Sequence, residues 1–255
     1  MSRSPRSTFL PLVVLALLGS PLACLDTIEP GEEQEPLPEN DSGRRDLTFA
    51  FDPGQSNWSG GYSDFPIAQD QKDIQFLLER RTTPAGTDRQ SSAQFVSSTN
   101  VSDDLFTFIT QQVSRLKPNT PYALTFELEL ASNAPRGCPG VNGSPGEDVF
   151  LKVGASLTQP LAMADPNTQQ FRLNVDKGNQ SVGGANAQVL GDIATESEQC
   201  FNTPYRIITR DNRGNPLRIT TDEQGKLWLF VGTDSDYRGT TELYYDIIHV
   251  VLEPS

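Results

Sequence analysis

Apolar and polar residues alternate along much of the chain after residue 45. The clearest example is segment 122–130, in which every second residue from Tyr122 to Leu130 is apolar and the residues between them are polar or small. A period of two places one face of a β-strand against a core. Segment 226–231 is apolar on both faces, which predicts a strand in the middle of a sheet. Further strands are predicted at 149–155, 171–175, 205–210 and 243–252.

Short runs of turn-forming residues separate these segments. Segment 211–216, with the sequence DNRGNP, is dense in such residues and is predicted to join two strands. No segment from Asp46 on has the pattern of an amphipathic helix, so the strands lack crossover helices and should pair antiparallel. The spacing gives about ten strands. We therefore expect an all-β fold, a single antiparallel β-sandwich of jelly-roll type over residues 46–255.

The N-terminal residues 1–23 have the order of a secretory signal peptide. Arg3 and Arg6 form a basic region, segment 9–18 is apolar, and Leu22 and Ala23 precede Cys24. The apolar run is too short to favour a membrane-spanning helix. The sequence thus predicts an exported protein.

The residues around Cys24 resemble the lipobox of bacterial lipoproteins, with Pro21 where that motif usually has leucine. The resemblance implies that Cys24 carries a diacylglycerol and becomes the mature N-terminus, and hence a lipid-anchored protein of the bacterial cell envelope. Leu25 follows the cysteine, where an aspartate retains Gram-negative lipoproteins at the inner membrane, so the resemblance implies the outer membrane or cell surface. Ordinary cleavage after Ala23 would instead give a soluble periplasmic or secreted protein.

The charge of the chain is strongly negative, with a formal value of −13. Seven acids and no base lie within segment 25–43, so residues 24–45 are predicted to be a disordered linker, either a tether behind an anchor or the tail of a secreted protein. From Asp46 on, 26 acids and 16 bases leave −10. Such a domain should be repelled by nucleic acid, whose phosphates need a basic partner, so we expect no nucleic-acid partner.

Two cysteines, Cys138 and Cys200, remain after Cys24 is assigned to lipid. In an oxidising compartment this pair predicts a disulfide. The chain has a single histidine, His249, which argues against a Cys–His catalytic pair or a zinc site.

Three segments resemble carbohydrate-binding modules of the galactose-binding-like jelly-roll type. The opening segment FAFD at 49–52 is followed by a tryptophan, segment 113–126 has a proline turn between two strands, and segment 243–250 resembles a closing strand. Segments 100–106, 143–149 and 174–181 also resemble an uncharacterised family of exported bacterial proteins, from which no activity follows.

The resemblance implies two kinds of site. A structural calcium often joins the first and last strands of such modules, which here points to Asp52 and Asp246; the alternative is two surface acids at strand ends. Asp234 and Asp236 lie in a segment that does not fit an EF-hand and is predicted to be an acidic turn.

Sugar binding needs aromatic faces and planar polar groups. Trp58 and Tyr62, in a Gly/Ser-rich segment predicted to be a loop, and Tyr237 in another loop are the aromatic candidates, although loop aromatics also cover the ends of sandwiches. The polar candidates form the densest polar group, which could equally be an ordinary strand end: Asn174, Asp176 and Asn179.

No catalytic residue can be nominated. A nucleophile motif of the form G-x-S-x-G is absent, and the neighbours Asp103 and Asp104 are predicted to stabilise a turn. We therefore expect a non-catalytic cell-envelope lipoprotein that binds a glycan or another envelope component. The alternatives are a structural or interaction protein of the envelope without a small-molecule site and, third, a hydrolase on the same fold.

Overall fold

The structure, a computed structural model, describes residues 42–53 and 57–255. The signal peptide, the lipidation at Cys24 and most of the linker were predicted for residues outside these ranges and stay predictions. The described part is all-β apart from one short 3-10 helix, η1 (Gln71–Ile74). None of its helices is long and apolar enough to cross a membrane.

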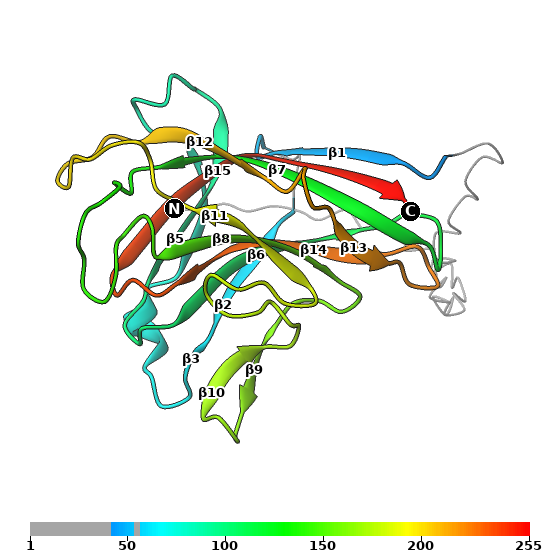
Figure 1. Cartoon of the computed structure of the whole chain (residues 1–255), viewed down its shortest axis with the longest axis horizontal. Coiled ribbons are helices and arrows are strands. Elements are labelled where there is room, and N and C mark those ends of the chain that lie inside the picture. Colours follow the sequence, from blue (N-terminus) through cyan, green and yellow to red (C-terminus); the bar gives the residue numbers. More distant parts are fainter. Residues whose placement is uncertain (1–41, 54–56) are drawn as a thin grey trace, which may run out of the picture. The chain divides into compact units, whose positions relative to one another are not determined.

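Two antiparallel sheets form the body of the sandwich (Figure 1). The seven-stranded sheet contains β1 (Arg45–Ala50), β4 (Leu77–Thr82), β5 (Ser92–Thr99), β7 (Pro121–Ser132), β12 (Arg206–Asp211), β13 (Leu217–Thr220) and β15 (Thr240–Pro254). The five-stranded sheet contains β2 (Ser59–Ser63), β6 (Leu105–Val113), β8 (Val149–Ser156), β11 (Ala187–Asp192) and β14 (Leu227–Ser235). A third, small sheet consists of β3 (Phe65–Pro66), β9 (Ala162–Asp165) and β10 (Gln170–Leu173).

The core lies between the two large sheets, and the period of two explains which residues enter it. All five predicted apolar positions of β7, from Tyr122 to Leu130, are fully buried. They share one cluster with the inward residues of β8, β14 and β15, such as Leu151, Leu229 and Ile248. The predicted antiparallel β-sandwich is therefore confirmed.

The order of strands confirms the central position predicted for segment 226–231. Its strand, β14, lies between β8 and β6 in the five-stranded order β11-β8-β14-β6-β2. The turn at 211–216 joins β12 and β13, which both pair with β7. The strand predicted at 171–175 ends earlier, at Leu173, and the described residues form fifteen strands instead of about ten.

The outer face of the five-stranded sheet is covered, in part by residues 172–186, which we call the cover segment. Leu173 and Val175 of this segment pack on Phe106, Phe108 and Phe230, whose side chains project from the sheet away from the main core. The β9–β10 hairpin leads into the cover segment, and Figure 1 shows it beyond the edge strand β2. This covering layer positions the features described next.

Two further links hold loops and ends in place. The predicted disulfide between Cys138 and Cys200 is present and joins the β7–β8 connection to the β11–β12 connection. At the other end of β7, the hydroxyl of the buried Tyr122 donates to the carbonyl of Gly43 at 2.9 Å and accepts from the amide of Lys117 at 3.1 Å. The linker-proximal end of the domain is therefore pinned to β7.

Candidate functional site

A cleft of about 380 Å³ opens at the edge of the five-stranded sheet, between β2, β6 and the connection that leads into β9. We call it the aromatic cleft, because Tyr62, Phe108 and Phe171 line it together with the amide side chains of Gln71 and Gln159. None of its lining residues is an acid or a base of the kind ionised at neutral pH. It is therefore an uncharged, aromatic depression on an otherwise acidic domain.

Gly61 in β2 explains why this edge is open. Gly61 lies opposite Phe108 on β6, and a Cβ atom at Gly61 would stand 3.1 Å from the Phe108 ring. A side chain there would cover that ring from the cleft side. The missing side chain thus leaves room in the cleft next to an aromatic floor.

The aromatic rings of the cleft are fixed by their neighbours. The Tyr62 ring packs 5.3 Å from those of Phe65 and Phe76, and its hydroxyl donates to Gln71 Oε1 at 3.1 Å. Phe171 stacks on Phe65 at 4.8 Å. Both Tyr62 and Phe171 remain half-buried, so part of each ring can meet a ligand. Rigid aromatic faces beside amide groups suit a ligand with both apolar and hydroxyl-rich surfaces.

The aromatic residues proposed from the sequence do not share one site. Tyr62 lies in β2 and not in a loop, and it lines the aromatic cleft. Trp58 lies just before β2, is only 7% exposed and packs edge-on against Phe49 at 5.3 Å. This burial agrees with the alternative of an aromatic that covers the sandwich, and the ligand-binding role of Trp58 stays a prediction. Tyr237 lines a separate cleft with Glu242 and Asn202.

The polar candidates shape turns. The side chain of Asn174 donates to the carbonyl of Gln159 and accepts from the amide of Leu161, both at 2.9 Å. The carboxylate of Asp176 accepts from the backbone amides of Ala185 and Gly178, which lower its pKa. Asn174 and Asp176 line a third depression, away from Tyr62 and Tyr237.

Asn179 exchanges two backbone hydrogen bonds with Val182 and closes the tip of the cover segment. Its side chain is exposed, and it lines none of the three depressions described above.

The acids proposed for calcium are placed differently from each other. Asp246 is almost completely buried; its carboxylate accepts from the Ser91 hydroxyl and lies 3.3 Å from the Arg89 guanidinium. Asp52 is exposed, and its carbonyl accepts from Arg80. Arg89 already offsets the charge of Asp246, so this geometry adds no support for calcium there, and the site stays a prediction.

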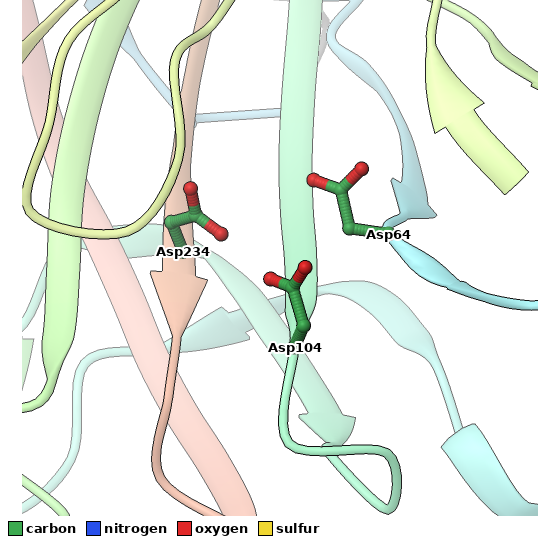
Figure 2. Close-up of side chains that lie close together, drawn as sticks. All are labelled: Asp64, Asp104 and Asp234. Carbon is green, nitrogen blue, oxygen red and sulfur yellow. The ribbon is translucent and has the colours of Figure 1, made fainter. Parts of the chain in front are cut away.

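A different group of acids comes together at the outer face of the five-stranded sheet. Asp64 follows β2, Asp104 precedes β6 and Asp234 lies in β14. One oxygen from each carboxylate lies within 4.8 Å of the others. Figure 2 shows the three carboxylates directed toward a shared space. Asp234 lies within β14 and is 0% exposed, so the predicted acidic turn begins only after Ser235 and does not include Asp234.

Three basic side chains accompany these acids. The ammonium of Lys177 lies 2.6 Å from Asp64 and 2.7 Å from Asp234, and the ammonium of Lys152 lies 2.8 Å from Asp234. Arg172 lies 3.2 Å from Asp64.

Arg172 also lies 3.3 Å from Asp104, so each of the three carboxylates has a cationic neighbour. We call these six residues the ionic cluster. Its three positive and three negative charges balance, which disfavours an added divalent metal ion in so buried a place.

Burial and charge shift the pKa values in the cluster. Burial, helped by the neighbouring carboxylates of Asp64 and Asp234, raises the pKa of Asp104 to about 6. Burial lowers the pKa of Lys152, against the opposing effect of Asp234. For Lys177 burial acts in the same downward direction, but the two carboxylates that it contacts prevail and raise its pKa.

The sequence contained one signal for this cluster. Lys152 is the single charged residue in segment 149–155, and it is 0% exposed in the structure. A buried lysine needs an acidic partner from another element. The identity of that partner, Asp234, depends on the pairing of β8 with β14 and could not be read from the sequence.

Comparisons with known proteins found matches among solved structures only. No family model matches the sequence, and no curated protein matches it either. Among solved structures, TmCBM61 in complex with β-1,4-galactotriose is 11% identical, with a TM-score of 0.34, over 79% of this chain and 89% of that one.

The K1 cleaved adhesin domain of Lys-gingipain from Porphyromonas gingivalis is 13% identical, with a TM-score of 0.35, over 83% and 99%. The carbohydrate-binding module CBM28, specific for non-crystalline cellulose, is 9% identical, with a TM-score of 0.33, over 81% and 93%. The low identities and TM-scores carry no function over to this chain.

Proposed function

We propose that this protein is a non-catalytic glycan-binding protein whose ligand lies in the aromatic cleft. The observation that carries the proposal is the cleft itself: Tyr62 and Phe171 offer fixed, half-buried rings, with Gln71 and Gln159 beside them. The apolar face of a pyranose packs on aromatic rings, and amides bind its hydroxyl groups.

The proposal is tested by binding to immobilised polysaccharides and a glycan array, with the variants Tyr62→Ala and Phe171→Ala. Loss of one stacking ring should weaken binding about tenfold, which corresponds to ~1.4 kcal/mol. The matched control is Met163→Ala. Met163 lies on the β9–β10 hairpin, as Phe171 does, but its side chain is 56% exposed and does not line the cleft. The proposal fails if the wild-type protein binds no glycan, or if the cleft variants bind as well as the control.

We further propose that the domain is held at the bacterial envelope by a lipid on Cys24. The lipobox-like segment and the acidic linker after it support this anchor. Radioactive palmitate supplied to a Gram-negative host expressing the full chain should label the wild type and not Cys24→Ser. Equal labelling of both, or none of either, would contradict the anchor and leave the glycan proposal standing.

A further inference from the structure

The cover segment and the sheet below it carry complementary charges. On the sheet side, Asp64, Asp104 and Asp234 face one base, Lys152, which leaves two negative charges in excess. The cover segment brings two positive charges, Arg172 and Lys177. Lifting the cover segment would therefore separate two positive charges from an excess of two negative charges on the sheet, and the attraction between them would be lost.

Hydrogen bonds to the backbone of the cover segment reinforce this contact. The ammonium of Lys152 donates to the carbonyls of Lys177 and Val182, at 3.0 and 3.1 Å. In return, the backbone amide of Gln180 donates to the carboxylate of Asp234 at 2.8 Å. The ionic cluster thus joins side chains and backbone of the cover segment to β8 and β14.

Two carboxylate oxygens of the cluster lack a hydrogen-bond donor among the described residues. They are Oδ1 of Asp104 and Oδ1 of Asp234, and both are buried. A third, Oδ2 of Asp64, has within the described part of the chain no other partner than the ammonium of Lys177, which lies 2.6 Å from it. A buried acceptor without a donor destabilises the structure around it, and more so when it is charged. A proton on one of these carboxyls would remove a charge and supply a donor.

We propose that the ionic cluster is a pH-dependent latch, which holds the cover segment more tightly against the five-stranded sheet in acid than at neutral pH. The cluster gains a proton as the pH falls, and Asp104 is the group that takes it. Its carboxyl faces Asp64, Asp234, Arg172 and Lys177.

The direction of the effect follows from what raises the pKa of Asp104. Burial is the largest cause, and together with the carboxylates of Asp64 and Asp234 it outweighs the opposing influence of Lys177 and Arg172. Opening the cover segment would admit water, which removes the burial and screens the carboxylates of Asp64 and Asp234. The pKa of Asp104 would then fall from about 6 toward the ordinary value of 3.8. The closed form therefore binds the proton more tightly, so closure is favoured below pH 6 and loses this contribution as the pH rises through 6.

Hydrogen exchange of the purified mature protein measures the latch directly. After correction for intrinsic exchange rates, protection of amides in residues 174–186 should be up to about tenfold greater at about pH 5 than at about pH 7.5, given the two pKa values. Asp104→Asn should abolish this pH dependence. The matched control is Asp103→Asn, because Asp103 pairs with Arg238 outside the cluster and should leave the dependence unchanged.

Other outcomes would overturn the latch. One is equal protection of residues 174–186 at both pH values in the wild type, and another is an unchanged pH dependence in Asp104→Asn. If that variant does not fold, the side-chain carboxyl carbon resonance of Asp104 in the wild type should titrate with a midpoint near 6. A resonance that does not titrate contradicts the proposal. Protection at neutral pH that rises with Ca²⁺ and falls with a chelator would assign the carboxylates to a cation instead. None of these measurements depends on glycan binding, so the latch can be tested whether or not the glycan proposal holds.

Discussion

At the scale of single residues, the buried hydroxyl of Tyr122 connects two backbone groups from different segments. Tyr122→Phe keeps the packing of the ring and leaves the carbonyl of Gly43 and the amide of Lys117 without their hydroxyl partner. We expect the free energy of unfolding in urea to fall by about 1–3 kcal/mol. The same substitution at Tyr205, whose hydroxyl bonds to exposed Glu242, should cost less. Equal losses in the two variants would contradict this role of Tyr122.

Residue type alone did not show which polar residues would be buried together. Asp103 and Asp104 are neighbours and acids, yet Asp103 turns outward to Arg238 whereas Asp104 enters the ionic cluster. Asp103 adopts a φ of 68°, in the left-handed region that aspartate tolerates better than most residues. This backbone conformation sends the two side chains in different directions, and no pattern in the sequence specified it.

At the scale of elements, the disulfide links two connections that the sheets do not hold. Loss of the Cys138–Cys200 bond frees a loop closed over a separation of 62 residues, and chain entropy puts its contribution at about 4 kcal/mol before any native strain. Cys200→Ser should lower the unfolding midpoint in denaturant, and reductant should lower the wild type to the same level. A midpoint that neither change moves would show that the bond does not stabilise the domain.

The strands that could be predicted are those whose own residues show a clear arrangement of apolar and polar side chains. Strand β7 alternates apolar and polar residues over its length, and β14 is apolar on both faces, so both could be found and β14 could be placed centrally. Strand β2 could not be found, because its residues SGGYS have almost no side chains with which to form a pattern. The aromatic cleft depends on that strand, so it was missed apart from Tyr62.

At the scale of the whole molecule, the all-β sandwich could be predicted from two local features of the sequence: the alternation of apolar and polar residues in strands, and the turn-forming residues between them. The sites could not, because they arise between segments far apart in the chain. Phe108 and Phe171 meet at the aromatic cleft, and Lys152 meets Asp234 only after β8 pairs with β14. Both features depend on the layer formed by the β9–β10 hairpin and the cover segment, which local patterns did not indicate.

The pairing of β1 with β15 has a consequence for how the connectivity of the chain could be changed. Arg45 lies opposite Leu252, and Arg44 forms an ion pair with Glu253 at 2.8 Å, so the chain enters and leaves the domain at the same end. A short peptide from Ser255 to Ser42 could close the chain into a ring, and the exposed turn at Gly214 could then be cut to give a circular permutant. By the same geometry, the whole domain could be inserted into a surface loop of a host protein, with its aromatic cleft still accessible.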